Sequence, residues 1–129
     1  MKTLVAVYGT LRKSGWNHSL IEKSLFLGST RTNNSWKMLV SGIPFITKGE
    51  DSIAIEVYEV DEATFRSLDR LEGFPDFYDR KLIDTEFGQA WIYFVHSINP
   101  RGLTYVKNGD YIEHLTRMAV DAYKRKAYL

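Results

Sequence analysis

LVAVYGTLR, at residues 4–12, is an apolar run that stops abruptly at a glycine. The run predicts a strand from about Thr3 to Tyr8, which Gly9 then breaks. A strand that ends at a glycine leaves the backbone N–H groups of the following residues without a partner in the sheet. Such free donors commonly bind a carboxylate, a carbonyl or a phosphate. The loop at residues 9–12 is therefore a candidate binding site for a group of this kind.

A second segment, DEATFRSLDRLEGFPDFYDR at residues 61–80, predicts a helix that begins after Asp61, a favourable N-cap. Gly73, directly after Glu72, and Pro75 end this helix. Phe65, Leu68 and Glu72 occupy positions i, i+3 and i+7, so they share one face. Leu71 widens the apolar stripe on this face, which leaves Glu72 pointing the way the apolar side chains point. Three polar residues of the helix have freer access to water: Arg66, Asp69 and Arg70.

The position of Glu72 makes its carboxylate unusual. A carboxylate on a buried face is costly unless it is paired, hydrogen-bonded or protonated. The last turn of a helix is also an unfavourable place for an anion. Both effects raise the proton affinity, which suits a general acid/base that works near neutral pH. The alternative is that the terminal turn frays and Glu72 simply reaches solvent.

The two segments together resemble the gamma-glutamylcyclotransferase-like superfamily, and more narrowly the short branch that contains gamma-glutamylamine cyclotransferases. The resemblance rests on YGTLR at residues 8–12 and LDRLEGFPDFYDR at residues 68–80, and it spans nearly the whole chain. Further pieces of the family pattern follow in order: Gly15, Asn17, Gly42-Ile43-Pro44, the late strand AWIYFV at residues 90–95, and NGDY at residues 108–111.

The resemblance implies roles for six residues. Glu72 matches the glutamate that acts as general acid/base, and Tyr78 matches a tyrosine that lines the same cavity. The backbone amides of one loop match those that hold the substrate: Tyr8, Gly9, Thr10 and Leu11. The family fold is α+β, a small mixed β-barrel with helices packed at its outside. We therefore expect one domain over residues 1–129, with no metal and no cofactor.

Two departures from the family pattern limit what can be transferred. Relatives often have a Gly-Glu pair in the strand before the helix, where this chain has Ile55-Glu56. Glu56 is then either an outward strand residue or a structural partner. The run Phe74–Phe77 is a variant of its own, so the specificity of the pocket cannot be copied from relatives.

The implied reaction needs only one ionisable side chain. The α-amine of a gamma-glutamyl group can attack its own γ-carbonyl, which closes the lactam 5-oxoproline and expels the other amine. The attacking amine must lose a proton and the leaving nitrogen must gain one, and a single carboxylate can do both. Because the nucleophile is already tethered, the enzyme has only to impose a near-attack geometry. The alternative is a non-catalytic pocket protein of the same fold, which binds a small carboxylate or a glutamyl-like ligand.

The composition narrows the function classes further. The chain has 129 residues, a net charge of +1 and no cysteine, which gives no electrostatic case for nucleic acid or a membrane surface and excludes disulfides. No apolar run approaches the roughly 18 residues of a membrane span. The three histidines are scattered, without the spacing of a metal site. We expect a cytoplasmic protein with a small-molecule gamma-glutamyl substrate; no oligomer is indicated, and the leaving amine cannot be read from the sequence.

The remaining elements follow from hydrophobic periodicity. We expect a short helix at about 17–24, three or four strands within 25–60, and a strand pair at about 81–85 and 89–95. A last helix runs from about Gly109 to Lys124. Its apolar face contains six residues: Ile112, Leu115, Met118, Ala119, Ala122 and Tyr123.

Overall fold

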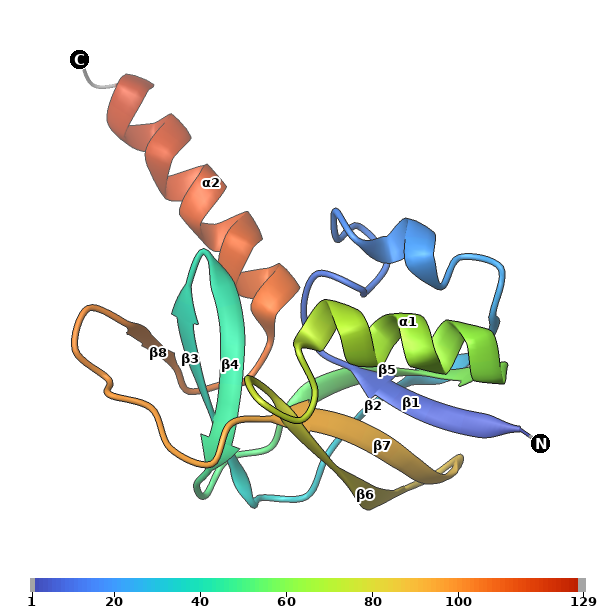
Figure 1. The fold of residues 1–129 in the computed structure, drawn as a ribbon. Coiled ribbons are helices and arrows are strands. Elements are labelled where there is room, and N and C mark those ends of the chain that lie inside the picture. The colour runs from blue at the N-terminus through green and yellow to red at the C-terminus, as the bar shows by residue number, and fades with distance from the viewer. Residues whose placement is uncertain (1, 128–129) are drawn as a thin grey trace.

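The computed structural model describes residues 2–127, in which eight strands and two α-helices are found (Figure 1). The elements follow one another in this order: β1 (Thr3–Val7), the 3₁₀ turn η1 (His18–Leu20), β2 (Leu25–Arg31), β3 (Trp36–Ser41), β4 (Ile43–Lys48), β5 (Ala54–Val60), α1 (Glu62–Glu72), β6 (Asp79–Thr85), β7 (Gly88–Phe94), β8 (Thr104–Val106) and α2 (Tyr111–Ala127). None of the helices in this part of the chain has the length and apolarity that a membrane span requires.

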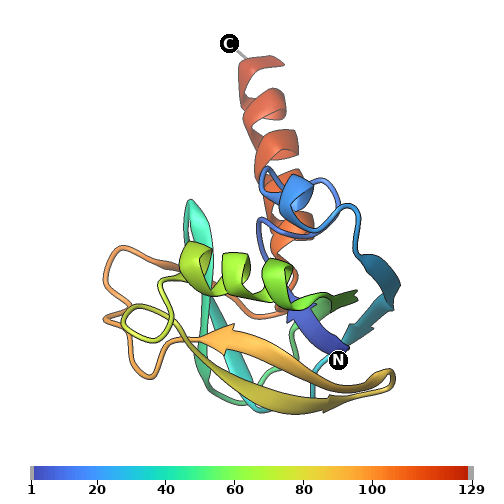
Figure 2. The same ribbon diagram turned by 45° about the vertical axis from the view of Figure 1, so that its right-hand side comes forward.

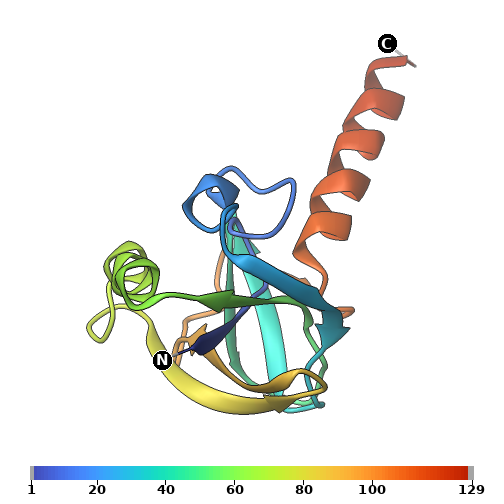
Figure 3. The same cartoon turned by 90° about the vertical axis from the view of Figure 1, so that its right-hand side faces the viewer.

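The strands form two sheets that curve around a common core (Figures 2 and 3). The larger sheet has the order β2-β5-β1-β7-β6, in which β1 and β7 are parallel and the other neighbours antiparallel. The smaller antiparallel sheet has the order β4-β3-β8. The Val95 N–H donates to the Ile46 carbonyl at 2.9 Å, where the chain just past β7 meets β4. The predicted α+β class is confirmed, with the barrel left open between its two sheets.

Alternation along β1 builds a core on each face of the larger sheet. Ala6 and Tyr8 point between the two sheets, whereas Val5 and Val7 point toward α1. The cluster between the sheets also contains Trp36, Met38, Val40, Ile46, Val57 and Ile92. The cluster under α1 also contains Tyr58, Val60, Leu68, Tyr78 and Tyr93. Strand β1 therefore lies between the two cores and contributes side chains to both.

Helix α1 has both of the caps that the sequence predicts. The Asp61 carboxylate accepts a hydrogen bond from the Thr64 N–H at 2.7 Å, which satisfies one of the free donors of the first turn. Gly73 adopts a left-handed conformation with φ of 65°, and its N–H and that of Phe74 cap the last carbonyls. Leu68 is fully buried on the inner face. The helix thus ends at Glu72, as predicted.

Three expectations for the other elements need correction. The helix expected at 17–24 is only the 3₁₀ turn η1, and β8 was not foreseen. The apolar face of the last helix is largely uncovered, because α2 projects away from the body of the domain (Figure 1). Ile112 and Leu115 pack on the core, but Met118 is 54% and Tyr123 75% exposed. An amphipathic pattern identifies the apolar stripe of a helix without specifying what covers it.

Candidate active site

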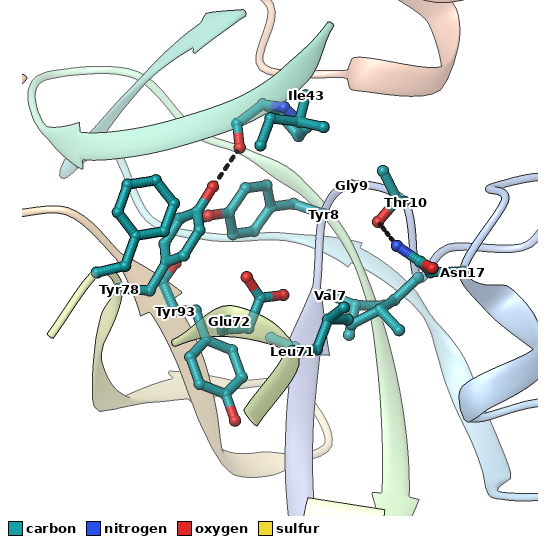
Figure 4. Close-up of a pocket in the computed structure, with 14 residues that line it drawn as sticks. Val7, Tyr8, Gly9, Thr10, Asn17, Ile43, Leu71, Glu72, Tyr78 and Tyr93 are labelled. Atoms are coloured by element: carbon teal, nitrogen blue, oxygen red, sulfur yellow. Dashed lines mark hydrogen bonds between the residues drawn. The ribbon is translucent and has the colours of Figure 1, made fainter. Parts of the chain in front are cut away.

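A cavity of about 140 Å³ lies where β1 ends, between the last turn of α1 and the start of β4 (Figure 4). All six residues that the sequence singles out line it: Tyr8, Gly9, Thr10, Leu11, Glu72 and Tyr78. Segments more than 60 residues apart in the chain are therefore brought to one place. The volume is below the roughly 300–1,000 Å³ of typical ligand pockets, so it suits a small group rather than a large ligand.

The loop after β1 is a tight turn that exposes backbone donors. The Arg12 N–H donates to the Gly9 carbonyl at 3.1 Å, which closes the turn. Asn17 fixes the turn from the other side, because its N–H donates to the Thr10 carbonyl and its side-chain amide to the Thr10 hydroxyl. Within residues 2–127, no group accepts a hydrogen bond from the Thr10 or Leu11 N–H. The free donors that the sequence predicts are thus present at the cavity.

Gly9 is required by a close approach between this turn and β4. A Cβ atom at this position would lie 2.7 Å from Cγ of Pro44, closer than real side chains tolerate. Pro44 itself is buried and lines the same cavity. The absence of a side chain at Gly9 therefore determines how closely the turn packs against the cavity wall.

The Glu72 carboxylate points into the cavity (Figure 4). Among the described residues, no hydrogen-bond donor or cation is paired with it, so no direct partner compensates its charge. Burial raises the pKa of Glu72 from 4.5 to about 7. A carboxyl group with this pKa can both accept and donate a proton near neutral pH. The alternative of a frayed last turn does not hold in this structure, because Gly73 and Phe74 cap it.

Three tyrosines surround Glu72, and each has its hydroxyl in a structural hydrogen bond. Tyr8 donates to the Tyr93 carbonyl at 2.9 Å, and Tyr78 donates to the Pro44 carbonyl at 3.0 Å. Tyr93 donates to Asp69 at 2.6 Å. Burial raises the pKa of all three tyrosines, and a charge on Glu72 raises it further. The wall around Glu72 is therefore neutral at physiological pH.

Tyr93 is a cavity residue that the sequence argument did not single out. It comes from β7, in which Ile92 points between the sheets and Tyr93 toward α1. Successive side chains of a strand point to opposite faces of the sheet, so the run AWIYFV at residues 90–95 already places Tyr93 on the face opposite Ile92. The sequence does not predict that β7 pairs with β1 in the sheet, which brings Tyr93 to the cavity.

The mouth of the cavity is apolar. Ile43, Leu71 and Phe77 line it and are each more than a third exposed. No Lys, Arg or His among residues 2–127 lines the cavity, and Glu72 is its only carboxylate. The described part of the chain also has no group of three or more acidic or histidine side chains that could hold a metal ion. The chemistry that this cavity offers is proton transfer beside free N–H donors.

Glu56 lies apart from this cavity and has a structural role. The residue is 4% exposed, and its carboxylate accepts hydrogen bonds from Arg12 Nε, the Lys13 N–H and the Tyr58 hydroxyl. The interpretation as a structural partner is therefore confirmed, and the outward orientation is wrong. The reason is the cation at Arg12, which compensates the buried carboxylate.

Asp69 also differs from its prediction. It does not have free access to water, because Arg80 reaches over from β6 and pairs with it at 2.9 Å. The helical position alone placed Asp69 outside the apolar stripe, but Arg80 from the next element along the chain covers it. This ion pair lies one turn before Glu72.

Comparison with known proteins agrees with the sequence pattern and with the fold. The family model described as "Gamma-glutamyl cyclotransferase, AIG2-like" matches residues 5–113. A protein from Vibrio cholerae named "Putative gamma-glutamylcyclotransferase" is 38% identical over 116 residues, which cover 89% of this chain and 100% of the relative. The gamma-glutamylcyclotransferase family protein YtfP from Escherichia coli K12 is 31% identical over 109 residues, 84% of this chain and 96% of YtfP.

Solved structures show the same fold. The crystal structure of protein PH0828 from Pyrococcus horikoshii superimposes with a TM-score of 0.80 at 32% identity, and the match covers 91% of this chain and 96% of that one. A mouse AIG2-like protein superimposes with a TM-score of 0.71 at 26% identity, covering 82% of this chain and 86% of the mouse chain.

Proposed function

Because the chain belongs to the gamma-glutamyl cyclotransferase, AIG2-like family, we propose that it releases 5-oxoproline from a small gamma-glutamyl amine or amide, with Glu72 as the general acid/base. The observation that carries the proposal is one cavity that holds both a carboxylate without a direct partner and a turn with free N–H donors. We further expect the reaction to take place in the cytoplasm.

The reaction forms one bond and breaks one. The substrate's α-amine loses a proton, and its nitrogen attacks the γ-carbonyl carbon to form the C–N bond of the lactam. Glu72 accepts the proton that the nucleophile releases, and it delivers a proton to the leaving nitrogen as the original C–N bond breaks. With a pKa of about 7, the carboxyl group is partly ionised and partly protonated at neutral pH, so both transfers are accessible to it.

The turn at Thr10 and Leu11 has the complementary role. Its free N–H groups would hold the glutamyl group and stabilise the negative charge that develops on the carbonyl oxygen during attack. One such donor typically contributes about 10²–10³-fold to the rate. Since the cavity measures only about 140 Å³, it suits the compact glutamyl part, with the leaving amine near the apolar mouth.

The test is a panel of gamma-glutamyl compounds incubated with the purified protein, with 5-oxoproline quantified by mass spectrometry. The panel contains glutathione, gamma-glutamyl amino acids and gamma-glutamyl-ε-lysine, which differ only in the leaving group. We expect 5-oxoproline from at least one of them. Release from none, combined with tight binding of 5-oxoproline, would instead identify a non-catalytic pocket protein.

A further inference from the structure

The last turn of α1 is held from outside by an ion pair. Asp69 lies three residues before Glu72, and it accepts hydrogen bonds from Arg80 Nε at 2.9 Å and from Arg80 Nη2 at 3.2 Å. The Tyr93 hydroxyl donates to the same carboxylate at 2.6 Å. A bidentate guanidinium–carboxylate contact fixes the relative orientation of the two side chains as well as their distance. The bonds from Arg80 link α1 to β6, and the bond from Tyr93 links it to β7.

The Arg80 guanidinium also lies within a cage of three aromatic rings. It lies 4.0 Å from the ring centre of Phe74, 4.4 Å from that of Trp91 and 4.7 Å from that of Phe65. All three distances fall within the range of cation–π attraction. Phe65 belongs to α1, whereas Phe74 follows the glycine that ends it. Arg80 therefore contacts the chain both before and after Glu72.

We propose that Asp69 and Arg80 are positioning residues, which hold the last turn of α1 so that the Glu72 carboxylate faces the cavity, and whose opposite charges cancel there. The catalytic meaning of this inference rests on the proposed function. The placement of the two residues does not, because it follows from the hydrogen bonds and ring contacts alone.

The charge part of the proposal can be isolated because the other groups that face Glu72 are neutral. They are Tyr8 from β1, Tyr78 from the chain before β6 and Tyr93 from β7. Asp69 and Glu72 are neighbours on the surface of one helix, as residues three apart are. Loss of one member of the pair would therefore leave a single uncompensated charge close to Glu72.

The test measures the titration of Glu72 in the free protein by the ¹³C shift of its carboxyl carbon, assigned by comparison with Glu72→Gln. Asp69→Asn leaves the Arg80 cation uncompensated, and we expect the Glu72 midpoint to fall. Arg80→Met leaves the Asp69 anion uncompensated, and we expect the midpoint to rise. Each shift should be on the order of half a pH unit or more, and the double variant should return close to the wild-type value.

The matched control is an exposed ion pair on the same helix, Glu62 with Arg66 at 2.7 Å. Glu62→Gln and Arg66→Met change the same charges at the other end of α1, so the Glu72 midpoint should stay in place. A midpoint that is unchanged, or that moves in the same direction, in Asp69→Asn and Arg80→Met would overturn the charge part of the proposal.

Arg80→Lys tests positioning apart from charge, because it keeps the cation and loses the planar fork. We expect the titration of Glu72 to remain near the wild-type value while kcat for 5-oxoproline release falls about 10-fold or more at a similar KM. A wild-type kcat in Arg80→Lys would refute positioning. If the wild-type protein released no 5-oxoproline, the proposed function would fail, and the titration would still decide whether the pair acts on Glu72.

Discussion

Arg12 Nε lies 3.0 Å from Oε2 of Glu56, which joins the residue after the candidate substrate-binding turn to β5 of the larger sheet. Both side chains are largely buried, and Nη1 of Arg12 lies 2.9 Å from Oδ1 of Asp110. The turn is thus anchored from behind to β5 and to the start of α2. Thr10 and Leu11, which line the cavity, are therefore followed directly by a residue held in a buried ion pair.

Removing the charge of Glu56 should therefore destabilise the protein. We expect Glu56→Gln to lower the free energy of unfolding by about 3 kcal/mol, because it leaves a buried guanidinium with one carboxylate instead of two. Urea denaturation measures the change. Glu62→Gln, which removes an exposed carboxylate, should change the free energy of unfolding by less than about 0.5 kcal/mol. Equal effects of both substitutions would contradict the anchoring role of Glu56.

Adding one methyl group at Gly9 should displace the turn. The new Cβ would meet Cγ of Pro44 at 2.7 Å, so we expect Gly9→Ala to lower kcat/KM for 5-oxoproline release by about 10-fold or more. Pro44→Ala removes the obstructing atoms, and the double variant should recover part of the activity. A Gly9→Ala enzyme with wild-type kcat/KM would show that the position of the turn does not matter.

Glu72 should make the stability of the protein depend on pH. Its pKa rises from 4.5 to about 7 on folding, so the folded state holds the proton more tightly, and stability is lost as the pH rises from 4.5 to 7. Above pH 7 the loss amounts to about 3 kcal/mol. We expect Glu72→Gln to be more stable than the wild type at pH 8 and similar to it at pH 4. Urea unfolding at the two pH values measures this, and a difference independent of pH would contradict it.

Helix α2 should depend on its first turn for attachment. Tyr111 is fully buried and donates a hydrogen bond to the Gly42 carbonyl, whereas Tyr123 is 75% exposed. We expect Tyr111→Phe to lower the free energy of unfolding by about 1 kcal/mol, since a carbonyl loses its donor. Tyr123→Ser should change it by less than about 0.5 kcal/mol. Thermal unfolding compares the two variants, and a larger effect at Tyr123 would mean that the outer part of α2 is covered.

Local signals in the sequence were enough for much of this structure. The N-cap at Asp61 and the glycine at position 73 predicted both ends of α1, and the apolar run LVAVY that stops at Gly9 predicted β1. The same reasoning put Glu72 on the inner face, because its position depends only on the period of the helix and on where the helix ends. The family resemblance added the pairing of this residue with the turn after Tyr8.

Contacts between separate helices and strands could not be predicted from local patterns. The sequence predicted that Asp69 is solvent-exposed. Its ion pair with Arg80 could not be foreseen, because the pair depends on where β6 packs against α1. Tyr93 joined the site through the parallel pairing of β7 with β1, which no local pattern specifies. The exposure of Met118 follows from the direction of α2, and amphipathicity does not determine that direction.

The most direct measurement for the central claim is the rate at which Glu72→Gln releases 5-oxoproline from the best gamma-glutamyl substrate, beside the wild type and Glu62→Gln. The glutamine keeps the size of the side chain and removes the group that carries the proton. If Glu72 is the general acid/base, its substitution lowers kcat by about 10²–10⁴-fold, and Glu62→Gln leaves kcat unchanged. A Glu72→Gln enzyme that keeps the wild-type kcat would contradict the proposed mechanism.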